Sequence, residues 1–460
     1  MQHRLFSQRS LAALVVPSLI TFALVSGCGD DDDNNGTGGT GGTGGRGGAA
    51  GKAGSGGSAG GAAKAGTGGK GGSAGSGTGG TAGAATGGKG GTGGKGGTGN
   101  TGESGNGGQG NNAGQGGEAG SQAGEGGSGG EATLPLVEQQ LVRADLAGDQ
   151  TGAVVVDSNL VNAWGLAINP LDSGALFWVS AADAGKLTVY DALGAVQTTV
   201  VTVPSANGTD TGSPTGQVFN AASADFMGDK FIAATEDGLI TGWQTGTTAE
   251  TRADRSAQSA SYKGIALVAN GTDHWLAAAN FHAGTVDVFD NTYTHVTTAG
   301  LFEDADLPAG YAPFNVAELA GSVWVTYAKQ DADKADDVKG AGNGYVNVFN
   351  TDGSFKKRFI SRGSLNSPWG LAIAPNTFAG LGGDVLVGNF GDGTIHAFNP
   401  TSGAEVGVLT ESANHPLVID GLWAIATGPN TTAANLTSTL FFTAGPGGET
   451  HGVFGSLTLP

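Results

Sequence analysis

Large apolar side chains are missing from a long stretch near the start of this 460-residue sequence. No Val, Ile, Leu, Met, Phe, Tyr or Trp lies between Gly29 and Ala132, and residues 36–130 contain 48 glycines in 95 positions. Such a segment has no apolar surface whose burial would offset the entropy lost on ordering. We therefore expect residues 28–132 to be a disordered linker rich in Gly, Ser, Thr and Ala, and residues 133–460 to form the folded domain.

Basic residues are scarce in that expected domain. Residues 1–132 carry eight basic and eight acidic residues, which leaves 13 basic and 32 acidic residues after them and places the whole net charge of -19 there. An acidic surface argues against nucleic acid and against anionic membrane as direct partners. It is compatible with cations, neutral sugars or simple solubility, and solubility is the favoured interpretation.

Cysteine occurs once, as Cys28, so no internal disulfide can form. The cysteine follows an apolar run, Leu11–Val25, which is short for a membrane span and typical of a signal peptide. The small residues that precede Cys28 resemble the lipobox of bacterial lipoproteins. The resemblance implies a cleaved signal peptide, residues 1–27, and a lipid anchor on Cys28 that holds the chain in the cell envelope, at the periplasmic face of the outer membrane or at the cell surface. The alternative is ordinary secretion with an incidental cysteine.

The domain contains a unit that repeats six times. In each copy an apolar strand, a Gly-containing turn and a second strand lead to an aromatic residue, with 46 to 60 residues between successive aromatics. These aromatics are Tyr190, Trp243, Phe289, Phe349, Phe398 and Phe454. Asp-Gly turns between apolar strands indicate β-hairpins.

A further strand of mostly small residues precedes most copies, and small residues suit the crowded centre of a propeller. The expected inner strands are 164–168, 221–225, 263–267, 314–318, 369–373 and 423–427. The unit length suits four-stranded blades, so the sequence predicts an all-β, six-bladed β-propeller. Residues 141–146 are expected to add an outer strand to the last blade. A β-sandwich and a β-helix are the rival folds.

Several motifs carry a family resemblance across the domain, among them NLVNAWGLA at 159–167, LNSPWGLA at 365–372 and VGNFGDG at 387–393. They resemble an uncharacterised family of exported bacterial six-bladed β-propellers, some of which carry a PEP-CTERM-type sorting signal. That resemblance implies the fold and brings no activity. More remotely, the strand starts are similar to those of NHL and gluconolactonase-like propellers, in which Glu, Asn and Asp bind a divalent metal. By this resemblance Asp420 and Asn162 or Asn366 would hold a divalent cation such as Ca²⁺, but the glutamate has no counterpart.

Polar residues stand just before or at the expected inner strands. They are Asn162, Asn220, Lys263, Asn315, Asn366 and Asp420. In a propeller such positions converge at one mouth of the central channel, which is the usual concave binding site. Hydrogen bonds to their own turns are the favoured interpretation for any single residue, although we expect at least two to face the pocket.

Two other groups have a structural interpretation that is favoured over a functional one. Trp164, Trp369 and Trp423 recur at one place in the repeat, which favours packing over sugar stacking. An insertion before Gly340 interleaves aspartates with lysines, which favours a solvated loop over a Ca²⁺ site. Its aspartates are Asp331, Asp333, Asp336 and Asp337.

Two functions remain open from the sequence. The favoured one is a cell-envelope lipoprotein that displays its propeller as a binding or scaffold module for a protein, glycan or small molecule. The linker and the lack of a Gly-x-Ser-x-Gly elbow or a P-loop in the domain support it. The alternative is a metal-dependent hydrolase of the lactonase type that acts in the central channel.

Overall fold

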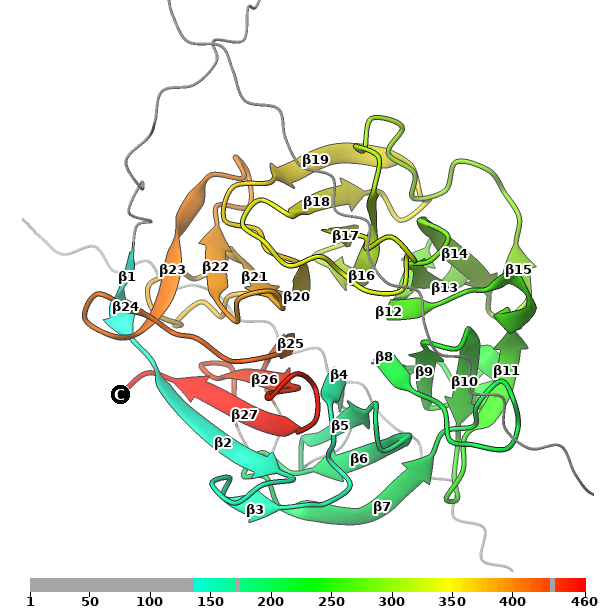
Figure 1. The fold of residues 1–460 in the computed structure, drawn as a ribbon, viewed down its shortest axis with the longest axis horizontal. Helices are drawn as coiled ribbons and strands as arrows, with labels where there is room; N and C mark the ends of the chain where they lie inside the picture. Colours follow the sequence, from blue (N-terminus) through cyan, green and yellow to red (C-terminus); the bar gives the residue numbers. More distant parts are fainter. Residues whose placement is uncertain (1–135, 171–173, 431–434) are drawn as a thin grey trace, which may run out of the picture. The chain divides into compact units, whose positions relative to one another are not determined.

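The computed structural model describes residues 136–170, 174–430 and 435–460. Within these ranges the strands form six sheets, arranged as blades around a central axis (Figure 1). The predicted all-β, six-bladed β-propeller is thereby confirmed. The predicted signal peptide, Cys28 and the Gly-rich linker lie outside the described residues.

The first three blades are four-stranded meanders that run outward from the axis. The first contains β4 (Ala163–Asn169), β5 (Leu176–Ala181), β6 (Lys186–Tyr190) and β7 (Val196–Thr202). The second contains β8 (Pro214–Phe219), β9 (Phe231–Thr235), β10 (Leu239–Trp243) and β11 (Glu250–Asp254). The third contains β12 (Tyr262–Asn270), β13 (Asp273–Asn280), β14 (Thr285–Asp290) and β15 (His295–Val296). Two short 3₁₀ turns, η1 (Phe226–Gly228) and η2 (Ser256–Gln258), lie in the loops.

The fourth blade is also a four-stranded meander, whereas the fifth and sixth blades receive strands from the start of the domain. The fourth blade contains β16 (Tyr311–Leu319), β17 (Ser322–Lys329), β18 (Gly344–Phe349) and β19 (Phe355–Ser361). The fifth contains β20 (Pro368–Ile373), β21 (Val385–Asn389), β22 (Ile395–Phe398) and β23 (Glu405–Ser412), with β24 (His415–Pro416) and β1 (Leu136–Gln140) beside β23. The sixth contains β25 (Leu422–Thr427), β26 (Leu440–Ala444), β27 (Val453–Thr458), β2 (Val142–Gly148) and β3 (Val155–Val156).

Inner strands β4, β8, β12, β16, β20 and β25 surround the axis, and each contacts the inner strands of the blades on both sides. Five of the six expected inner strands are confirmed by this arrangement. The expectation for residues 221–225 was wrong, because that segment is a loop and β8 is the inner strand of the second blade. Pro214 and Gly216 made β8 resemble a turn. Gly216 is needed there because a Cβ would lie 2.7 Å from the backbone nitrogen of Ile265 in the next blade.

In the first five blades the aromatic that closes the repeat unit pairs with a residue in the first half of the second strand. Tyr190 pairs with Phe177, Trp243 with Phe231, and Phe398 with Val385. In the sixth blade this position belongs to Leu457, which pairs with Leu440. Phe454 lies near the opposite end of β27, so its assignment to the repeat position was wrong.

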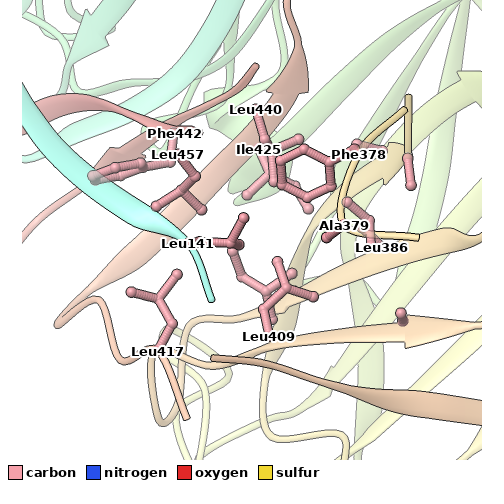
Figure 2. Close-up of a cluster of buried hydrophobic side chains, with 14 of the residues drawn as sticks. Leu141, Phe378, Ala379, Leu386, Leu409, Leu417, Ile425, Leu440, Phe442 and Leu457 are labelled. Carbon is pink, nitrogen blue, oxygen red and sulfur yellow. The ribbon is translucent and has the colours of Figure 1, made fainter. Parts of the chain in front are cut away.

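The ring is closed by strands from both ends of the domain. Strand β2 pairs antiparallel with β27, and this confirms the outer strand predicted from residues 141–146. Leu141, between β1 and β2, is buried in a cluster with side chains of the fifth and sixth blades, including Leu409, Leu440 and Leu457 (Figure 2). Apolar burial therefore supports the closure along with hydrogen bonds. In the described part of the chain no helix has the length and apolar character needed to cross a bilayer.

Candidate functional site

One position recurs on the inner strands near the end where they begin. Aromatic residues hold it in four blades, and Thr215 and Lys263 hold it in the second and third. The four aromatics are Trp164, Phe314, Trp369 and Trp423. All four are buried, in one cluster with Phe281 and Phe390, which follow β13 and β21. We call these six residues the aromatic plug.

Trp423 lies at the centre of the aromatic plug. Its ring stacks on Trp164 at a centroid distance of 3.7 Å and on Phe390 at 3.8 Å, with interplanar angles of 14° and 15°. Its Nε1 donates a hydrogen bond of 3.0 Å to Oδ1 of Asn162. Trp369 meets Trp423 edge-on, and its Nε1 donates to the backbone oxygen of Lys263 at 2.9 Å. The favoured interpretation of the three tryptophans, packing, is what the structure shows.

Charged residues gather at the same end of the channel. Most of them follow the second strand of a blade, and because the blades are antiparallel, second strands end where inner strands begin. Together with Lys263 on β12 these residues form what we call the charged mouth. It comprises Asp183, Glu236, Lys263, Asp336, Asp337, Lys339 and Glu449.

Lys263 is the buried cation of the charged mouth, with a side chain only 4% exposed. Its ammonium pairs with Glu236 and, at 3.4 Å, with Asp336, and it lies 5.5 Å from the ring centroid of Trp164. Burial acts to lower the pKa of Lys263, but the two carboxylates outweigh it, so the net shift is upward. The group therefore stays charged.

Asn162 links the plug to two acids. Its Nδ2 donates to Oε2 of Glu449 at 3.0 Å and, more weakly, to Oδ1 of Asp183 at 3.5 Å. Burial raises the pKa of both carboxyls, Asn162 opposes the shift, and the negative charge of Glu236 adds to it. Asn162 and Glu449 also adopt left-handed backbone conformations, with φ of 50° and 70°. Strained backbone of this kind is found preferentially at functional sites.

The insertion between β17 and β18 crosses the aromatic plug. We call residues 330–343 the strap. Gln330 Nε2 donates to the backbone oxygen of Phe281 at 2.6 Å, and the backbone N–H of Gly340 donates to Oδ1 of Asn366 at 2.6 Å. The ammonium of Lys339 lies 3.9 Å from the ring centroid of Phe390. The predicted solvated loop is thus tied to the third and fifth blades.

On the other side of the plug lies a cavity in the central channel. It has a volume of about 460 Å³ and is lined mainly by small and apolar residues of the inner strands, with Trp369 of the plug in its wall. Gln217, Asn315 and Glu318 contribute polar groups. Nδ2 of Asn315 donates to the backbone oxygen of Trp369, and Nε2 of Gln217 to that of Gly165, each bridging to a neighbouring blade.

The six polar residues chosen from the sequence separate into three places. Asn162, Lys263, Asn366 and Asp420 lie at the end where the inner strands begin. Asn315 lies within β16 and lines the channel. The structure does not bring Asn220 to this group, since it follows β8 at the opposite end, where its Nδ2 donates to backbone oxygens of its own loop.

Three of these residues were also expected as metal ligands. Oδ1 of Asn162 accepts from Trp423, Oδ1 of Asn366 accepts from Gly340, and Oδ2 of Asp420 accepts from the backbone N–H of Gly447 at 2.8 Å. Each therefore already binds an N–H donor of the protein through one oxygen. Over the described ranges, no cluster of three or more His, Cys, Asp or Glu side chains has a geometry that would hold a metal ion.

Sequence reasoning missed the hairpin-loop acids Asp183, Glu236 and Glu449. It looked for the site at the strand starts, whereas these residues come from the turns of the repeated hairpins. A signal was present: the turns Ala-Asp-Ala-Gly at 182–185 and Glu-Asp-Gly at 236–238 occupy the same place in successive repeats. Superposing the repeats would have shown that these turns share one end of the channel.

Comparison with known proteins gives sequence relatives and structural neighbours. No family model matches the chain. Among solved structures, the soluble aldose sugar dehydrogenase of Escherichia coli superposes with a TM-score of 0.45 at 12% identity, covering 70% of this chain and 100% of that one. A streptogramin B lyase superposes with a TM-score of 0.41 at 10% identity, covering 70% and 98%.

Sequence relatives come from Acanthamoeba polyphaga mimivirus. Uncharacterized protein R648 is 30% identical over 322 residues, which cover 66% of this chain and 76% of the relative. Uncharacterized protein L690 is 31% identical over 322 residues, which cover 65% and 81%. The chain therefore belongs to the protein family that includes R648 and L690 of this virus.

Proposed function

We propose that the chain is a binding module whose ligand enters the central channel. The observation that carries this proposal is the cavity of about 460 Å³, lined by inner strands and bounded by the aromatic plug. Its volume lies within the range of small-molecule sites, roughly 300–1,000 Å³. Its mainly apolar lining, with polar groups from Gln217, Asn315 and Glu318, fits a small ligand that is largely apolar and carries a few polar groups.

A thermal-shift screen with matched variants tests this role. Ala317 lines the cavity, and Ala317→Trp would fill it, whereas Ala195 is exposed in the β6–β7 loop and Ala195→Trp leaves the cavity open. We expect small ligands that raise the melting temperature of the wild type and of Ala195→Trp but not of Ala317→Trp. Ligands that stabilise all three proteins equally, or a broad panel with no stabilising member, would refute binding in the channel.

The anchor is proposed on the sequence alone. The lipobox-like residues before Cys28 support a lipidated, cell-envelope protein of the exported bacterial kind, with the linker as a tether of about 50–60 Å mean reach. In a Gram-negative host, the full chain is expected to incorporate labelled palmitate and to sediment with membranes. Cys28→Ser is expected to do neither, and incorporation of label by this variant would contradict the assignment of the anchor.

The lactonase-type alternative remains a prediction from resemblance. It requires a divalent cation held with the help of Asp420, and elemental analysis of protein purified without chelator decides it. A stoichiometric metal that is lost in Asp420→Ala would favour the hydrolase. Equal metal content in the wild type and the variant would remove Asp420 from that role.

A further inference from the structure

The aromatic plug presents one face to a cation of the protein itself. Trp164, Trp423 and Phe390 form a continuous stack of three rings, and Lys339 places its ammonium 3.9 Å from the centroid of Phe390 at one end of it. This is well inside the 6 Å within which a ring face attracts a cation. In the described part of the chain, no carboxylate lies within ion-pair distance of that ammonium, so the ring is its direct partner.

The surroundings of Lys339 are rich in negative charge. Glu449 and Asp337 both interact electrostatically with Lys339 and Lys263. Among the residues that the structure describes, one oxygen of Asp337 is buried without a hydrogen-bond partner. Burial raises the pKa of both carboxyls, and Ser367 opposes the rise at Asp337. The charged mouth as a whole holds five carboxyl groups and two ammonium groups, so an added positive charge would be stabilised there.

We propose that the charged mouth binds the ammonium group of a small organic cation on the face of Phe390, and that Lys339 occupies this position in the absence of the ligand. The strap thus acts as an internal competitor. This site lies on the opposite side of the aromatic plug from the channel cavity, and it does not depend on the channel binding proposed above.

The strap is suited to exchange because two of its charged side chains reach solvent. Lys339 lies on the surface, and the Asp336 side chain that pairs with Lys263 is 76% exposed. A cation–π contact made by an exposed cation, such as that of Lys339 with Phe390, contributes little net stability. A ligand ammonium can therefore replace Lys339 without disrupting the core beneath, because the plug is held separately by Asn162 and by the backbone of Lys263.

The test measures binding of two probes by the full chain in mild detergent, by titration calorimetry at constant ionic strength. The probes are tetramethylammonium, as a free quaternary cation, and Nα-acetyl-lysine methylamide, as a peptide lysine. Lys339→Gln removes the internal competitor, and Lys334→Gln is the matched control, since Lys334 is an exposed lysine of the same strap. We expect Lys339→Gln to bind at least one probe about five-fold more tightly than the wild type, and Lys334→Gln to match the wild type.

Two controls establish that the ring and the charge are responsible. Nα-acetyl-norleucine methylamide lacks the ammonium and should not bind Lys339→Gln. Adding Phe390→Leu to Lys339→Gln should weaken binding several-fold. If that double variant does not unfold cooperatively, Asp337→Asn in the Lys339→Gln background takes its place and should also weaken binding. Equal affinity of the wild type and Lys339→Gln, equal binding of the neutral probe, or no binding at all would overturn the proposal, while the channel screen with Ala317→Trp would be unaffected.

Discussion

The stabilisation of a buried charge in this propeller depends on single partner residues, and Lys263 is the clearest case. Its ammonium is enclosed at the channel mouth and relies mainly on Glu236, because Asp336 is farther away and exposed to solvent. Removal of one partner from a buried ion pair leaves a charge without compensation, which costs far more than loss of a surface pair.

Glu236→Ala is therefore expected to lower the free energy of unfolding by about 3 kcal/mol, measured by urea denaturation. The matched control is Glu250→Ala, because Glu250 also pairs with a cation but is 72% exposed, and its partner Arg252 keeps two hydrogen bonds to Asp229. The control should lose less than about 1 kcal/mol. Similar small losses in both variants would mean that Lys263 is stabilised by water in place of Glu236.

Glu449 makes stability depend on pH. Burial raises its pKa above the ordinary 4.5, so between the two values the folded state binds more protons than the unfolded state. The contribution of Glu449 to the free energy of unfolding is fully present below its ordinary pKa. That contribution is lost as the pH rises through the raised pKa of the folded state. Glu449→Gln is expected to equal the wild type in stability near pH 4 and to exceed it near pH 7.

Glu405 makes stability depend on pH in the opposite direction to Glu449. Burial acts to raise its pKa, but contact with His396 outweighs burial and lowers the pKa below its ordinary value. Glu405→Gln should therefore lose stability at pH 7 and approach the wild type on acidification. Chemical denaturation near pH 4 and near pH 7 tests both variants. A loss of stability at pH 7 in Glu449→Gln would mean that the buried charge of Glu449 does not destabilise the folded protein.

Inner strands illustrate what the sequence could predict at the scale of an element. The Trp-Gly-Leu-Ala-Ile pattern at 164–168 and 369–373 was recognised because small residues dominate such strands and suit the crowded centre of a propeller. Strand β8 was missed because Pro214 and Gly216 are typical turn residues, and only its position against β12 shows why the glycine is required. Likewise, the recurring tryptophans could be predicted to pack, but the stack with Phe390 joins residues that no local pattern connects.

Because the inner strands approach closely, we expect a single methyl group added between them to lower the free energy of unfolding. At Gly370 a Cβ would lie 2.8 Å from the backbone oxygen of Trp423 on the next inner strand, so the two strands must move apart. Gly370→Ala should lower the free energy of unfolding by about 1–3 kcal/mol. The control is Gly174→Ala, in the β4–β5 loop, where no described residue lies within 4 Å of the added Cβ and φ is not positive. It should be neutral or slightly stabilising, and equal losses at both glycines would show that the inner strands have room for a Cβ.

Closure of the ring is a property of the whole molecule. Segments more than 300 residues apart in sequence meet where β2 pairs with β27, as at Val142 and Thr458. Strand β1 adds a parallel strand to the fifth blade, so the first residues of the domain bridge the fifth and sixth blades. The sequence indicated the sixth-blade strand, but gave no sign of the pairing of β1 with β23, since a parallel edge strand carries no turn signal of its own.

Substitutions at two neighbouring residues can measure how much apolar burial, as distinct from hydrogen bonding, contributes to closure of the ring. Figure 2 shows Leu141 in the cluster between the fifth and sixth blades. Leu141 is 3% exposed, whereas Val142 is 49% exposed. Leu141→Ala should cost about 2–5 kcal/mol of unfolding free energy, and Val142→Ala at most about 0.5 kcal/mol. Urea denaturation monitored by tryptophan fluorescence and by circular dichroism measures both. If the closure holds the ring as one cooperative unit, the two signals will change together in each variant; a small loss in Leu141→Ala would mean that strand pairing alone closes the propeller.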